Sequence, residues 1–198
     1  MARTNTLARS LHDVGLSAWF GGSLMGAVGV NGASQEVADP KDRIRVGNAG
    51  WGRWTPVNLV AIVAHLLGGL QLIRGNSARV AGQEGVRQMT AVKTGVTAAA
   101  LGATAYSRVL GQKLMEAEAD AARHTPSNVG LEGEDAVTPS SSTPDDVATA
   151  QRQLKILQWV IPALTGIIVI LNARMGEQQR PASVAAGLLD RFTPGKSS

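Results

Sequence analysis

Three long stretches of this chain carry no Asp, Glu, Lys or Arg, and charged residues stand close to their ends. They cover residues 14–35, 54–73 and 156–173. A helix rises about 1.5 Å per residue, so about 20 mostly apolar residues cross the ~30 Å hydrocarbon core of a bilayer. The lengths and the charged boundaries therefore predict three membrane-spanning helices.

A fourth apolar stretch is shorter and leaves two readings open. Residues 94–107 lie between Lys93 and Arg108 and would span only about 21 Å as a helix. Both long side chains could carry their charges to the interface, and residues 88–92 would then complete a crossing. Otherwise the helix is buried without spanning, and the two ends of the chain lie on opposite sides. We predict the crossing.

The predicted fold class is an all-α integral membrane bundle of four transmembrane helices. Leu110, Leu114, Ala117 and Ala121 share one helix face, which predicts an amphipathic extension of the third helix. The loop rich in acids, Pro, Ser and Thr is predicted to be disordered. The predicted parts are residues 1–123 (helices 1–3 with the extension), 124–150 (disordered loop), 151–175 (helix 4) and 176–198 (amphipathic tail).

The first apolar stretch also resembles a secretory signal sequence, because a basic segment precedes it. Its length and the poor cleavage site at Asn31 and Ala33 favour retention as a helix. With four crossings both termini share one side, which holds ten of the 19 basic residues. That count alone does not decide the orientation. Several of the other nine lie near the long loop, where the positive-inside rule is weak, so we favour cytoplasmic termini.

The composition agrees with helices in lipid and excludes several site classes. The 23 glycines suit close helix packing, while aromatic residues make up only 4%. Without Cys the chain has no disulfide, no thiolate catalysis and no Cys-based metal site. The net charge of +4 comes without a basic stripe interleaved with aromatics, so we predict no nucleic-acid partner.

Glycines recur along one face of the first predicted helix. Gly15, Gly22 and Gly29 are seven residues apart, and Gly26 completes a GxxxG pattern with Gly22. Because glycine lacks Cβ, a partner backbone can approach closely. The pattern predicts a helix-packing surface. Its partner could be another helix of this chain or a second copy.

An ionisable residue lies in the middle of the second stretch. His65 is expected to face the bundle interior, and Asn58 lies seven residues earlier on nearly the same face. The two form a possible intramembrane polar site, although a neutral histidine satisfied between helices is the simpler interpretation. Measured from the ends of the apolar runs, His12 and His65 differ in depth by over ~10 Å, which argues against a bis-histidine haem.

Three segments carry a family resemblance: LHDVGLSAWFGG at residues 11–22, WGRWTPVNL at 51–59 and QRQLK at 151–155. They resemble an uncharacterised four-helix membrane protein family of high-GC Gram-positive (actinobacterial) bacteria. The resemblance implies a membrane bundle over nearly the whole chain. It carries no activity that could be transferred.

The sequence favours a role without catalysis. No GxSxG, HExxH, Walker-type or GxGxxG pattern occurs, so we predict no enzyme, no cofactor and no metal. Our leading hypothesis is a multi-pass plasma-membrane protein that acts by helix–helix association, as an oligomer or as an accessory subunit of a membrane complex. Its partners would be lipid and a second copy or another membrane protein. The alternative is a small-solute or ion transport protein with a polar site around His65.

Overall fold

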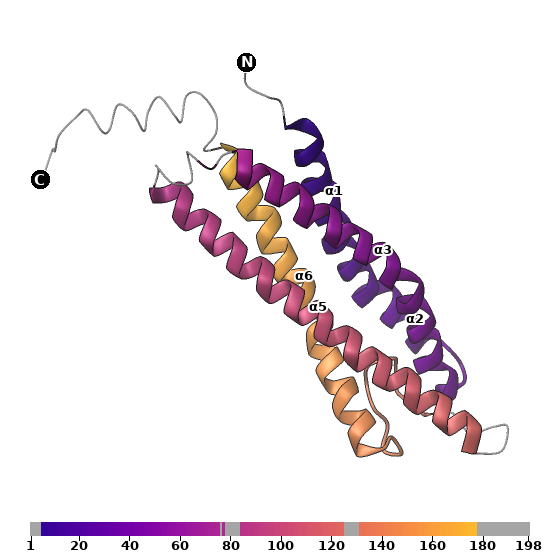
Figure 1. Cartoon of the computed structure of the whole chain (residues 1–198). Helices are drawn as coiled ribbons and strands as arrows, with labels where there is room; N and C mark the ends of the chain where they lie inside the picture. The colour runs from indigo at the N-terminus through magenta and orange to yellow at the C-terminus, as the bar shows by residue number, and fades with distance from the viewer. Residues whose placement is uncertain (1–4, 76, 78–83, 125–130, 178–198) are drawn as a thin grey trace, which may run out of the picture.

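The computed structural model describes residues 5–75, 77, 84–124 and 131–177, and these are almost entirely helical (Figure 1). They contain no strand, only one isolated bridge between Gly133 and Pro139. The prediction of an all-α fold is therefore confirmed for this part of the chain. The tail predicted from residue 176 onward lies almost wholly outside the described residues.

Four long helical rods form an elongated bundle (Figure 1). The elements are α1 (Thr6–Met25), the π-turn η1 (Gly26–Val30), α2 (Asn31–Gln35), α3 (Pro40–Gly75), α5 (Glu84–His124) and α6 (Asp145–Glu177). α1, η1 and α2 run on as one rod, since the residues at their junctions have helical dihedrals. α1 packs mainly on α3 and α5 on α6, while α1 also contacts α6. Neighbouring rods run in opposite directions.

Two of the rods are long and apolar enough to cross a membrane. They are α3 and residues Asp145–Gly176 of α6, with mean hydropathies of 1.8 and 2.0 in their most apolar windows. The other two predicted crossings do not meet this measure. α1 carries Arg9, His12 and Asp13 in its first turns, and the apolar part of α5 consists largely of Ala, Gly and Thr.

Large apolar side chains lie on the outside of the bundle. Examples are Leu59 and Val60 of α3, Ile170 of α6 and Val14 of α1, each more than 60% exposed. Several polar side chains are buried instead: His12, Ser23, Asn31, Ser34, His65, Gln151 and Thr165. Exposed apolar surface on this scale marks a contact with lipid or with another protein.

The α5 helix continues unbroken beyond its apolar part, as the predicted extension requires. Leu110 and Leu114 are buried in one cluster with Ile44 of α3 and Val147 of α6. Ala117 packs against the same cluster. The apolar stripe therefore joins α5 to its neighbours beyond the span 94–107.

The loop before α6 differs from the predicted disorder where the structure describes it. Asp135 is only 6% exposed and accepts hydrogen bonds from Val137 N, Thr138 Oγ1 and Gln35 Nε2. Burial opposes ionisation, but these hydrogen bonds outweigh it and hold the pKa of Asp135 below its usual value. Composition alone missed this, because short polar side chains here satisfy the loop's own backbone.

The fourth long helix also begins earlier than predicted. α6 starts at Asp145 instead of residue 151. Asp145 and Asp146 lie in its first turn, where negative charge stabilises the helix dipole. The acidic residues that indicated disorder therefore support a helix start.

Candidate functional site

Two histidines from neighbouring helices stack on each other near the end of the bundle where α1 begins. The ring centroids of His12 (α1) and His65 (α3) are 4.0 Å apart, with an interplanar angle of 15°. His12 Nδ1 lies 2.8 Å from the His65 carbonyl oxygen, and His65 Nδ1 lies 3.0 Å from the His12 carbonyl oxygen. A carbonyl oxygen only accepts hydrogen bonds. Each Nδ1 therefore carries a proton and donates a hydrogen bond to the backbone of the opposite helix.

Two glycines let the helices approach closely enough for these bonds. A Cβ added to Gly15 would lie 2.6 Å from His65 N, and a Cβ added to Gly68 would lie 2.6 Å from His12 N. Both distances are too short for any side chain. Gly15 and Gly68 therefore flank the histidine pair with direct backbone contact.

A repeated sequence pattern underlies this arrangement. α1 carries Ala8-x3-His12-x2-Gly15, and α3 carries Ala61-x3-His65-x2-Gly68, exactly 53 residues later. Because α1 and α3 run antiparallel, the two copies face each other with near two-fold symmetry, and Ala8 and Ala61 contact the opposite glycines. This repeat is not among the predictions made from the sequence, although its spacing is present there.

The other glycines of the predicted packing surface differ in their surroundings. A Cβ on Gly22 would meet the Trp54 ring, and one on Gly26 would meet Trp51. Gly29 has only Met25 of its own rod nearby. Gly15, Gly22 and Gly26 thus pack on α3 of the same chain.

The predicted depth difference between the histidines is wrong. It was measured from the ends of the apolar runs, whereas packing sets His12 level with His65. Stacked at 4.0 Å, the rings leave no room for a porphyrin between them. Among the described residues no group of three or more His, Asp or Glu could hold a metal ion. Asn58 lies apart from the pair, and its buried Oδ1 has no hydrogen-bond donor within the described structure.

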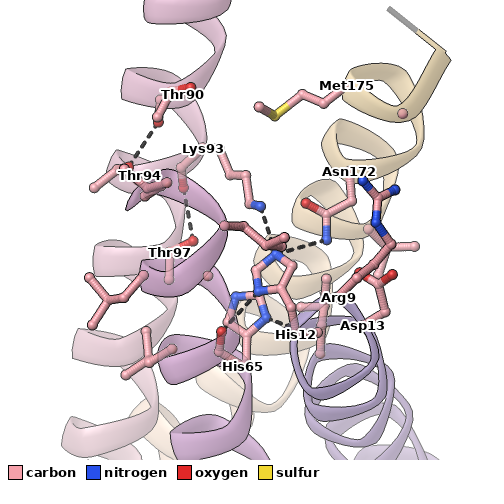
Figure 2. A pocket seen from close by; sticks show the side chains of 18 of the residues that line it. Arg9, His12, Asp13, His65, Thr90, Lys93, Thr94, Thr97, Asn172 and Met175 are labelled. Carbon is pink, nitrogen blue, oxygen red and sulfur yellow. Dashed lines mark hydrogen bonds between the residues drawn. The ribbon is translucent and has the colours of Figure 1, made fainter. Parts of the chain in front are cut away.

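A lysine from α5 completes the cluster. Lys93 Nζ lies 2.7 Å from His12 Nε2 (Figure 2). The expectation that Lys93 extends to the interface is therefore wrong, because its side chain turns into the bundle. The ammonium donates, so His12 Nε2 accepts and the ring is neutral. Asn172 Nδ2 of α6 makes a longer contact of 3.4 Å with the same nitrogen.

The cluster lies in the wall of a cavity of about 560 Å³ between α1, α3, α5 and α6. Its charged lining residues are Arg9, Asp13 and Lys93. Its apolar lining residues include Leu16, Leu66, Leu70, Ile73, Val86, Leu101 and Val169. Thr90, Thr94 and Thr97 line the α5 side, and their hydroxyls donate to carbonyls of α5 itself.

A tryptophan covers the histidine pair on the interior side. Trp19 is fully buried and meets the His65 ring edge-on, with centroids 6.2 Å apart. Its indole Nε1 donates to Thr104 Oγ1 of α5 at 3.2 Å. The polar cluster is thus separated from the bundle interior by a large apolar ring.

No protein-family model, curated protein or solved structure matches this chain. Function must therefore be argued from the site. The resemblance to the actinobacterial membrane family stays a prediction.

Proposed function

We propose that this chain is a four-crossing membrane protein that binds a small solute in the cavity and takes part in its transport. The observation that carries the proposal is the cavity itself. A space of about 560 Å³ has largely apolar walls, and four helices each contribute a polar side chain to its lining: His12, His65, Lys93 and Asn172. Small-molecule sites typically combine such walls with a few convergent polar groups in a volume of roughly 300–1,000 Å³.

The positions of basic residues support four crossings. Arg53 and Arg74 stand at the two ends of an uncharged part of α3, and Lys155 and Arg174 at those of α6. Arg87 and Arg108 enclose a part of α5 whose one charged residue is Lys93. Each pair is separated by 19 or 21 residues, or about 28–32 Å along a helix. These separations match the hydrocarbon thickness of a bilayer. The fourth crossing is the rod from Thr6 to Gln35, whose 30 residues exceed the same thickness.

Aromatic residues support one membrane interface. Trp51, Trp54, Tyr106 and Trp159 lie 11 to 14 residues along their helices from the level of the polar cluster. Tyr106 and Trp159 are about half exposed. Rings with one polar edge favour the boundary between lipid and water. The cavity then lies toward the opposite interface, where α1 begins and α6 ends.

The glycine surface gives no support to association with a second copy. Gly15, Gly22 and Gly26 are covered by α3 of the same chain. The feature that led us to favour association is therefore already used within the bundle. A dry, closely packed interior would argue against solute binding. The interior beside His65 instead contains the cavity.

Filling the cavity should abolish solute binding. Ala98 lines the cavity and the neighbouring Ala99 does not, although both are exposed. We expect Ala98→Trp to occupy the cavity, and Ala99→Trp serves as the matched control. Intact-protein mass spectrometry of the detergent-purified protein should find a small molecule bound to wild type and to Ala99→Trp, but not to Ala98→Trp.

Transport is tested with the molecule so identified. Proteoliposomes with wild type or Ala99→Trp should take it up, and those with Ala98→Trp should not. The proposal fails if wild-type protein carries no small molecule, or if Ala98→Trp retains it at the wild-type level.

A further inference from the structure

We infer that the cavity accepts an amphiphile with a negatively charged headgroup, which Lys93 binds while the apolar chain lies along the cavity wall. The inference rests on the proposed function and names its ligand class. Three observations carry it: the charge of Lys93, the apolar walls and the size of the cavity.

The Lys93 ammonium lacks a close counter-ion in the described structure. The salt bridges described there join Arg45 to Asp42, Lys113 to Asp146 and Arg123 to Asp120. Asp13 lines the same cavity and attracts the Lys93 charge, but no salt bridge between the two is described. An ionised side chain within a bilayer is destabilising unless a partner compensates its charge. A bound anion would compensate this charge.

The ammonium also has donors available for a ligand. It carries three N–H groups, and His12 Nε2 accepts from one of them at 2.7 Å. His12 is held in that accepting form because its Nδ1 donates to the His65 carbonyl. The histidine pair therefore holds the Lys93 side chain in the cavity wall (Figure 2). With Arg9 and Asp13 included, the charged lining residues sum to one positive charge.

The remaining walls suit an apolar chain. Leu66 and Leu70 of α3 face the cavity together with Val86 and Leu101 of α5. α3 and α5 contact each other only sparsely, so the cavity lies where these two helices diverge. A volume of about 560 Å³ is far larger than an inorganic anion needs. Charge and walls together fit an anionic amphiphile.

The lysine ammonium acts as a point charge, so it can bind either a carboxylate or a phosphate. The amphiphile could therefore be a free fatty acid or an anionic phospholipid. Equilibrium binding to detergent-purified protein separates these sources and tests the class. The probes are oleate, oleyl alcohol with the same chain but no charge, and phosphatidylglycerol as a competitor. The variants are Lys93→Met, Lys93→Arg and, as a control on the same helix, Lys113→Met.

We expect wild type to bind oleate about 10–100-fold more tightly than oleyl alcohol, because a hydrogen bond to a charged group contributes about 1.5–3 kcal/mol. Lys93→Met should lose that difference, whereas Lys93→Arg should keep most of it. Lys113→Met should bind like wild type, since Lys113 lies outside the cavity and pairs with Asp146. Displacement of oleate by phosphatidylglycerol would identify a phospholipid ligand, and resistance to it a free fatty acid.

Equal binding of oleate and oleyl alcohol by wild type would overturn the anionic class and leave the proposed function standing. This comparison needs no variant, so it does not depend on how substitutions fold. Unchanged oleate binding by Lys93→Met would also overturn the inference. If wild type binds neither probe and carries no small molecule from the cell, the proposed function fails as well.

Discussion

Replacing Gly68 with alanine is expected to lower the free energy of unfolding by about 1–3 kcal/mol, although alanine is the better helix former. The new Cβ would lie 2.6 Å from the backbone nitrogen of His12 and 2.5 Å from the carbonyl oxygen of Ala8. Backbone atoms of a helix cannot turn aside as a flexible side chain can. α1 and α3 would have to separate, which lengthens both hydrogen bonds of the histidine pair.

Thermal unfolding in detergent, followed by circular dichroism, measures this effect. Gly15→Ala should behave like Gly68→Ala, because it occupies the equivalent position in the other copy of the repeat. Gly21→Ala on the same helix is the control, since nothing lies within 4 Å of its added Cβ. It should leave stability unchanged or raise it by up to ~1 kcal/mol. Equal stability of Gly68→Ala and Gly21→Ala would contradict the close α1–α3 contact.

His12→Leu should lower the free energy of unfolding by about 2–4 kcal/mol. The variant loses the hydrogen bond to the His65 carbonyl and leaves Lys93 without its hydrogen-bond acceptor. Most of that loss arises because the charged Lys93 ammonium is left without its acceptor. Lys93→Met should therefore recover about 1–3 kcal/mol in the His12→Leu background.

A double-mutant cycle of these two positions, measured by unfolding in ligand-free detergent, isolates the coupling. Lys113→Met in the same background is the matched control, because Lys113 lies at the other end of α5 and is half exposed. Lys113→Met should restore none of the lost free energy of unfolding. Additive effects of His12→Leu and Lys93→Met would show that the 2.7 Å contact contributes no stability.

The sequence predicted most of the helices because uncharged length and charged boundaries are local properties. Both spans that satisfy length and composition, α3 and α6, contain predicted stretches. The Leu110 and Leu114 face was also visible, since a helical period needs no knowledge of its partner. His65 was found by the same logic, as an ionisable group within an apolar run.

The partners of His65 could not be found in this way. Depth measured from the ends of apolar runs assumes that the runs of different helices end at the same height in the bilayer. In the structure the contact of Gly15 and Gly68 sets the register of α1 against α3 instead. Ala and Gly are so common here that the repeated Ala8 and Ala61 pattern does not stand out. Lys93 looked like a boundary residue, and only its place opposite His12 makes it part of the site.

The described part of the loop, residues 131–144, differs from the prediction for a different physical reason. A composition rich in Asp, Ser and Thr indicates disorder only while those side chains face water. Asp135 instead bonds to its own loop and to Gln35. Such closure depends on the geometry of a few residues, which composition does not record.

If lipid surrounds these rods as we propose, α5 crosses the membrane, and cysteine labelling along α5 measures that crossing. The chain has no cysteine, so each introduced thiol is unique. Gly85, Gly102 and Gly111 all lie on α5 with open space around them. Gly111 lies 26 positions after Gly85, which corresponds to about 39 Å along the helix.

With intact membranes and a membrane-impermeant maleimide, Gly85→Cys and Gly111→Cys should be labelled from opposite sides. Gly102→Cys should be labelled only after the membrane is dissolved. Labelling of Gly85→Cys and Gly111→Cys from the same side would contradict the α5 crossing. Recovery of the protein in water without detergent, with all three thiols reactive, would contradict the membrane bundle altogether.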